Sequence, residues 1–220
     1  MSEVADSSAD QTGEPASELL YFADPMCSWC WGFAPVIEKV AANYANSLPL
    51  HIFVGGLAVG VKKPLGEKGK AEIQAHWRHV EQDTGQSFDY AFFDRESFVY
   101  NSELPSYAVV AVRNARLNAL YFLTAIQRAF YQRNRDITSL STLSEIAGEI
   151  GLDESSFRAK VNDRETIEHA TKDFELSQRL GIQGFPALLG MANKKIELLT
   201  MGYQPYDALV PKIDEWCKAI

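Results

Sequence analysis

The chain has 220 residues, of which 46% are hydrophobic and 23% are charged, a balance typical of a globular protein that can bury a core. Asp and Glu number 29 against 21 Lys and Arg, a formal net charge of -8, and this acidic character disfavours nucleic-acid binding. No run approaches the roughly 18 consecutive apolar residues of a membrane-spanning helix, which excludes that class of protein.

The N-terminal segment is polar. Residues 1–18 (MSEVADSSADQTGEPASE) contain four acidic residues before position 15 and no apolar stretch. A secretory signal would begin with basic residues and continue with an apolar region of about 7–15 residues. We therefore expect a disordered tail over residues 1–18 and a cytoplasmic protein.

The next segment has the pattern of a β-α-β unit. Residues 19–23 (LLYFA) predict a buried strand that ends at Asp24-Pro25. Residues 29–44 have apolar side chains at helical spacing, and residues 50–54 (LHIFV) predict a second strand closed by two glycines. Such a crossover favours two parallel strands with a right-handed connection.

The middle of the chain shows helical patterns and no convincing strand alternation. The predicted helices cover residues 69–84, 105–117, 119–131 and 164–180, with a short helix after Asp153. Thr138 is expected to cap a further helix, and Gly151 to end it. We interpret residues 58–164 as a helical insertion.

Strand patterns return near the C-terminal end. Residues 187–189 and 196–200 are predicted to form an antiparallel hairpin that begins directly after Pro186. Pro205 then introduces a last helix over residues 206–218. The complete order is β-α-β, helical insertion, α-β-β-α.

Two of the three cysteines form a Cys-x-x-Cys motif, Cys27-Ser28-Trp29-Cys30, at the start of the first predicted helix. Residues three apart share a helix face, so the two thiols can form a disulfide. Unpaired N–H groups and the dipole at a helix N-terminus favour the thiolate, which is the attacking form. We predict that Cys27 is the nucleophile and that Cys30 resolves the mixed disulfide.

This order of elements, with the dithiol motif and the later Gly184-Phe185-Pro186, resembles the thioredoxin fold, and the helical insertion resembles its DsbA-like branch. The stretches DPMCSWCWGF (24–33) and GIQGFP (181–186) are similar to the cytosolic, FrnE-like members. The resemblance covers about residues 19–218. It implies a thioredoxin-like domain formed by residues 19–57 and 165–220.

The resemblance also implies a function, thiol-disulfide oxidoreductase or isomerase. The partners would be protein or small-molecule disulfides, glutathione among them, with neither a cofactor nor a metal. Phe185-Pro186 matches the cis-proline loop that faces the dithiol, where the proline lacks a donor and the backbone of residue 185 pairs with an extended substrate. The family usually has a smaller or β-branched residue in place of Phe185, which leaves the shape of the groove open.

The aromatic residues beside the cysteines have different expected roles. Trp29, between them, is expected to be exposed and to contact substrate, whereas Trp31 is expected in the core. Asp24 is interpreted as a turn residue, with a second reading as a proton acceptor for the thiol if it is buried nearby. His76-x-x-His79 lies too far along the chain from the cysteines for a zinc finger, so solvated histidines are predicted.

Two alternatives stay open. Kappa-type glutathione transferases and hydroxychromene carboxylate isomerases resemble the same architecture, but they need no resolving thiol, so Cys30 argues against them. The second alternative is a non-catalytic interaction module that docks a partner through aromatic residues of the insertion. Those residues, which we expect rather to cover the core, are Tyr90, Phe92, Phe93, Phe98 and Tyr100.

Overall fold

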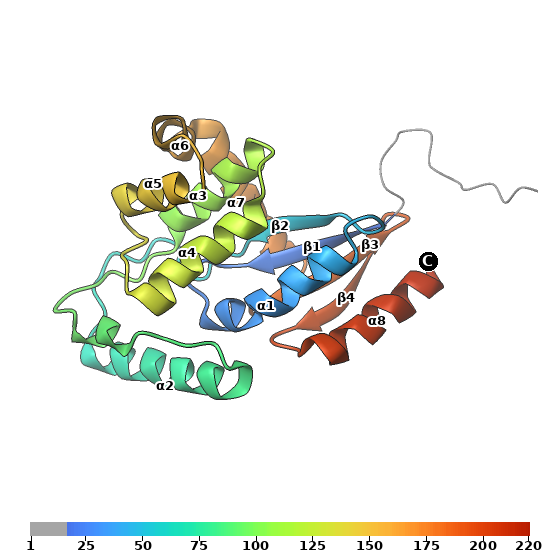
Figure 1. The fold of residues 1–220 in the computed structure, drawn as a ribbon, viewed down its shortest axis with the longest axis horizontal. Coiled ribbons are helices and arrows are strands. Elements are labelled where there is room, and N and C mark those ends of the chain that lie inside the picture. The colour runs from blue at the N-terminus through green and yellow to red at the C-terminus, as the bar shows by residue number, and fades with distance from the viewer. Residues whose placement is uncertain (1–16) are drawn as a thin grey trace, which may run out of the picture.

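The computed structural model describes residues 17–220, which form a four-stranded sheet covered by helices (Figure 1). The tail predicted over residues 1–18 lies outside the described residues, apart from Ser17 and Glu18. These two residues belong to the first strand, so the strand begins earlier than predicted. Within the described range, no helix has both the length and the apolar character needed to cross a membrane.

The sheet has the order β2-β1-β3-β4. β1 (Ser17–Ala23) pairs in parallel with β2 (Leu50–Val54), in the register Leu19 to Leu50. β3 (Ala187–Ala192) runs antiparallel to β1, and β4 (Lys195–Met201) runs antiparallel to β3 at the sheet edge. The predicted parallel pair and the predicted hairpin are both confirmed.

The helices also follow the predicted order. α1 (Ser28–Asn43) links β1 to β2, and α8 (Tyr206–Ala219) ends the chain beside α1. Between β2 and β3 lie α2 (Glu67–Thr84), the 3-10 helix η1 (Tyr90–Asp94), α3 (Glu103–Asn114), α4 (Ala119–Arg133), α5 (Leu140–Glu149), α6 (Glu154–Val161) and α7 (Arg164–Arg179).

One predicted helix cap is wrong. α5 has Ser139, not Thr138, at its N-cap. The hydroxyl of Thr138 instead donates to Asp136 Oδ1 at 2.6 Å, because a turn precedes the helix there. Gly151 does follow the end of α5, with a φ of 86° that suits glycine.

Alternation along β1 gives the sheet two buried faces. Leu19, Tyr21 and Ala23 enter the large core with α1, whereas Leu20 and Phe22 join a smaller cluster with residues of α7. Because successive side chains of a strand point to opposite faces, a near-continuous apolar run is what a strand covered on both sides requires. The sequence LLYFA therefore specifies a strand in the interior of the sheet.

The aromatic residues of the insertion pack mainly with one another. Trp77 of α2 is fully buried, and its ring centroid lies 5.1 Å from that of Phe92 and 5.2 Å from that of Tyr131. Phe92 and Phe98 are 2% and 6% exposed. Phe92 and Phe98 are thus core residues, and Tyr90, Phe93 and Tyr100 are half-buried against the same core, as expected for residues that cover it.

A partly buried ion pair between Arg113 and Asp173 fastens the insertion to the end of β2. Asp173 of α7 accepts hydrogen bonds from the Arg113 guanidinium at 2.6 Å and from the Val54 N–H at 3.1 Å. Arg113 of α3 also donates to the Ile52 carbonyl at 2.7 Å. Burial raises the pKa of Asp173, and the Arg113 charge opposes that rise. This pair fixes the strand that leads into the loop beside the dithiol.

Candidate active site

Cys27 occupies the N-cap of α1. Its backbone is extended, with φ −89° and ψ 114°, and its Sγ accepts the Cys30 N–H at 3.4 Å. An N-cap side chain lies next to N–H groups that have no partner within the helix. The structure therefore places the Cys27 sulfur where the helix end favours negative charge.

The two thiols differ in accessibility. Cys27 is 6% exposed and Cys30 is 0% exposed, and neither is bridged. Burial raises the pKa of the Cys30 thiol well above its usual value, and the hydrogen bond with Cys27 and the charge of Asp24 act in the same direction. Cys30 is thus a protonated thiol behind the more accessible sulfur.

The loop before β3 meets the dithiol from the other side. The Phe185–Pro186 peptide bond is cis, and the Cys27 thiol donates to the Phe185 carbonyl at 3.3 Å. The two residues are 158 positions apart in the chain. The fold therefore brings together the two motifs that the sequence analysis paired by resemblance.

The Phe185 side chain explains how an aromatic residue is accepted before this proline. Its ring packs directly on Gly55, so that a Cβ atom at position 55 would overlap the far end of the ring. Phe185 also contacts both core clusters. The backbone carbonyl of Phe185, and not its ring, is the part that meets Cys27.

Gly55→Ala is expected to push the Phe185 ring outward and to shift the loop that faces Cys27. Overpacking of this kind costs about 1–3 kcal/mol, and the disulfide-exchange rate is expected to fall with it. A second substitution, Phe185→Leu, removes the overlapping ring atoms and is expected to recover most of the loss. Denaturant unfolding and exchange assays on both single variants and the double variant measure this coupling. Purely additive losses would contradict the contact.

Trp29 is less exposed than predicted. It is half-buried, and its ring lies 5.6 Å from that of His79 in α2 and 6.2 Å from that of Tyr203 after β4. The insertion and the C-terminal hairpin thus reach the residue between the two cysteines. Trp31 is in the core as predicted, with 2% exposure and its Nε1 donating to the Ser87 carbonyl at 3.2 Å.

Asp24 is fully buried and ties three segments together. Its Oδ1 accepts the Met26 N–H at 2.8 Å, and its Oδ2 accepts the Leu57 N–H at 2.8 Å and the Ser102 hydroxyl at 2.9 Å. Burial raises the pKa of Asp24 to about 6, although these hydrogen bonds lower it. Asp24 is therefore both a turn residue and a buried acid near the dithiol, which combines the two readings of the sequence.

Three tyrosines complete the surroundings of the cysteines: Tyr21 and Tyr131, which are buried, and Tyr100, which is half-buried. Burial raises the pKa of each hydroxyl, and the charge of Cys27 raises each further. All three are therefore neutral near pH 7. Tyr100 is one of the aromatic residues expected to cover the core, but a place beside the cysteines was predicted for none of the three, because a single aromatic residue carries no signal that separates it from ordinary core residues.

The remaining candidate ligands lie apart from the dithiol. His76 and His79 are exposed on α2, as expected for solvated histidines. Within residues 17–220, no three His, Cys, Asp or Glu side chains gather in a way that could hold a metal ion. Cys217 lies on α8, where burial raises the pKa of its thiol.

Comparison with known proteins places this geometry among dithiol proteins. A family model described as the DSBA-like thioredoxin domain matches residues 18–214. The chain is 36% identical to a candidate protein disulfide isomerase from Nitrosomonas europaea, with a TM-score of 0.87, over 94% of this chain and 99% of that one. It is 28% identical to the cytosolic disulfide reductase DsbM from Pseudomonas aeruginosa, with a TM-score of 0.77, over 92% and 100%. A second DsbM structure contains GSH and superposes with a TM-score of 0.74.

More distant curated relatives have a different role. The ClpXP adapter protein SpxH from Bacillus subtilis is 22% identical over 78% of this chain and 57% of its own length. SpxH from Halalkalibacterium halodurans is 22% identical over 96% of this chain and 72% of its own length. The chain thus spans little more than half of the Bacillus protein.

Proposed function

Because the chain belongs to the DsbA-like thioredoxin domain family, we propose that it exchanges the Cys27–Cys30 dithiol with disulfides of protein or small-molecule substrates. The predicted α/β thioredoxin-like fold with its helical insertion is confirmed by the same match and by the structural relatives. One observation carries the proposal. The Cys27 sulfur lies at the helix N-cap, where it accepts the Cys30 N–H, and opposite the Phe185 carbonyl, and the Cys30 thiol is fully buried.

The proposed reaction has two steps. The Cys27 thiolate attacks one sulfur of the substrate disulfide, forms a mixed disulfide and releases the first substrate thiol, which takes up a proton. Cys30 then loses its proton and attacks the Cys27 sulfur, which releases the second thiol and leaves a Cys27–Cys30 disulfide. The substrate is reduced by two electrons and the protein is oxidised by two; the reverse sequence makes a disulfide in the substrate.

Three further residues have proposed substrate roles. Pro186 offers no N–H at the point where the substrate approaches, and the Phe185 carbonyl can pair with an extended peptide. Trp29 supplies a half-buried aromatic surface next to the sulfurs. The DsbM structure with GSH supports glutathione as one small-molecule partner, and the description of DsbM as cytosolic supports our proposal of a cytoplasmic protein.

Cys30→Ser is expected to trap the mixed disulfide, because the step that resolves it is removed while the attacking thiol is kept. After incubation with glutathione disulfide, intact-mass measurement of this variant should show one glutathione per chain, and tryptic mapping should place it on Cys27. Cys27→Ser is the matched control and is expected to stay unmodified at positions 27 and 30.

The same variants separate exchange from glutathione transfer. A kappa-type transferase needs no second cysteine, so Cys30→Ser would then turn over at an undiminished rate without accumulating an adduct. That outcome would replace the proposed function with the transferase alternative.

The SpxH relatives support a second candidate, protein binding without redox chemistry. An adapter that uses this fold only for docking would bind its partner equally well when both cysteines are replaced. Insulin reduction by the wild type, lost in Cys27→Ala, would favour the oxidoreductase over this candidate. An equal and negligible insulin reduction by both proteins would favour the adapter.

A further inference from the structure

The turn that leads into α1 is held by side chains of the insertion. Met26, the residue before Cys27, is 1% exposed, and its carbonyl accepts a hydrogen bond from the hydroxyl of Tyr100, 74 positions further along the chain. Its N–H donates to Asp24 Oδ1 at 2.8 Å. Both backbone polar groups of Met26 are thus bound by side chains, and the carbonyl depends on the insertion for its partner.

The Tyr100 hydroxyl has a second contact, with the Tyr131 hydroxyl of α4 at 3.5 Å. A tyrosine hydroxyl has one proton to donate, and that of Tyr100 goes to the Met26 carbonyl, so Tyr131 is the donor in this contact. Burial raises the pKa of Tyr100, and the hydrogen bond from Tyr131 opposes that rise. Hydrogen bonds in such a chain polarise one another, so Tyr131 makes Tyr100 a stronger donor.

Helix α4 reaches the same turn at a second position. Gln127 lies one helical turn before Tyr131 and is 1% exposed. Its Nε2 donates at 3.4 Å to the Asp24 carbonyl, which also accepts the Cys27 N–H at 3.1 Å. Residues four apart share a helix face. One face of α4 therefore supports both carbonyls of the turn, directly at one and through the tyrosine hydroxyls at the other.

These contacts bear on the charge of the Cys27 sulfur. The Met26 carbonyl and the Cys27 N–H belong to one peptide unit, so the direction of this carbonyl sets how Cys27 enters α1 and how its Sγ meets the Cys30 N–H. A donor on a carbonyl oxygen fixes its direction and offsets its negative potential. Burial raises the pKa of the Tyr100 and Tyr131 hydroxyls, and the charge of Cys27 raises each further, so both hydroxyls lie within electrostatic reach of the sulfur.

We propose that Tyr100, supported by Tyr131, is a positioning residue that holds the Met26–Cys27 peptide unit and thereby favours the thiolate of Cys27. The purpose of this role rests on the proposed exchange function, to which it adds a task for the helical insertion. Without the hydroxyl, the buried Met26 carbonyl lacks its donor. The peptide unit can then turn, and the contact of Cys27 Sγ with the Cys30 N–H weakens.

Tyr100→Phe tests the proposal, because it keeps the ring and removes only the hydroxyl. The rate at which iodoacetamide labels Cys27 of the reduced protein is followed over a wide pH range, with peptide mapping to separate this cysteine from the others. The midpoint of the profile is expected to move upward by about half to one pH unit in Tyr100→Phe. Tyr131→Phe is expected to move it in the same direction by less, since Tyr100 still binds Met26.

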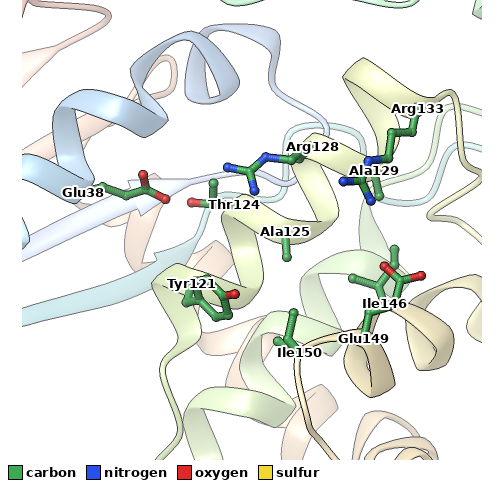
Figure 2. A pocket seen from close by; sticks show the side chains of 10 residues that line it. All are labelled: Glu38, Tyr121, Thr124, Ala125, Arg128, Ala129, Arg133, Ile146, Glu149 and Ile150. Carbon is green, nitrogen blue, oxygen red and sulfur yellow. The ribbon is translucent and has the colours of Figure 1, made fainter.

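Two other tyrosines of the insertion provide matched controls. The Tyr90 hydroxyl donates to Glu81 Oε2 at 2.9 Å, so Tyr90→Phe also loses a hydrogen bond and stability, but away from the turn. Tyr121 is an exposed residue of α4 and lines a hollow toward α5, on another side of this helix from Gln127 (Figure 2). Tyr90→Phe and Tyr121→Phe are both expected to keep the midpoint of the wild type.

A midpoint that moves no further in Tyr100→Phe than in Tyr90→Phe would overturn the proposal. If Tyr100→Phe does not fold, which urea unfolding shows, Tyr131→Phe decides instead, and a midpoint equal to that of the wild type would then overturn it. Alkylation needs no disulfide substrate. A chain that did not exchange disulfides would still show the shift, so failure of this proposal and failure of the proposed function are distinguishable.

Discussion

Cys27→Ser is expected to lower the rate of disulfide exchange by about three orders of magnitude or more, since it removes the sulfur that we propose attacks the substrate. A serine hydroxyl stays protonated near neutral pH and forms no disulfide. The loop with Phe185 and Pro186, which we propose contacts the substrate, is kept, so substrate can still bind. The rate of insulin or glutathione disulfide reduction, coupled to a thiol reductant, measures the effect.

Alkylation tests the expected difference in reactivity between Cys27 and Cys30 without a substrate. Iodoacetamide is expected to label Cys27 of the reduced protein first and Cys30 much later, because Cys30 is 0% exposed and burial raises its pKa. Cys217→Ser is the matched control for the third thiol and is expected to leave the exchange rate unchanged. A Cys27→Ser chain that still reduced insulin at the wild-type rate would place the chemistry elsewhere.

Local patterns were enough to predict the frame of this site. The apolar run of β1, the helical spacing after Cys30 and the glycines after β2 are each contained in a few consecutive residues. The exact start of a helix was harder to predict: Thr138 was the predicted N-cap of α5, and the structure has Ser139 at that position. Two adjacent residues with similar capping ability cannot be ranked until the preceding turn is known.

The contacts around the sulfurs depend on residues distant in sequence. Gly55 reads as the end of a strand, and only the fold shows that its missing side chain makes room for Phe185. The sequence around Trp29 predicts an exposed side chain, but in the fold His79 of α2 lies against its ring. In both positions the partner lies in another element, and its distance along the chain hides the pairing from any local pattern.

The hydrogen-bond partners of Asp24 are also distant in sequence, and its burial leads to the second large predicted effect, a loss of stability as the pH rises. Its neighbour Pro25 marks a turn, but Asp24 accepts hydrogen bonds from the Leu57 N–H in the loop after β2 and from the hydroxyl of Ser102, the N-cap of α3. Those partners hold a carboxyl group in the interior, next to a thiol. The charge of Asp24 raises the pKa of Cys30, so the ionisation of this acid is coupled to the dithiol.

The wild type is expected to lose about 3 kcal/mol of stability relative to Asp24→Asn as the pH rises from about 3 to about 7. The pKa of Asp24 is raised from 3.8 to about 6 in the folded protein. Well below pH 3.8 the carboxyl group is protonated in both the folded and the unfolded state, and the stability difference between the two proteins does not change with pH. Between the two pKa values the unfolded chain ionises first, so folding becomes less favourable, and above the folded pKa the difference is constant.

Urea unfolding of the wild type and of Asp24→Asn at closely spaced pH values measures this difference in stability. The other titrating groups are common to both chains, so their contributions cancel in the difference. Ser102→Ala is the matched control: it keeps the carboxyl group but removes a hydrogen bond that lowers the pKa of Asp24, so the decline should extend to higher pH. A difference that rose with pH would mean that Asp24 is stabilised as the carboxylate. In that case the three hydrogen bonds to its oxygens would outweigh its burial, and its charge would act on Cys30 throughout the physiological range.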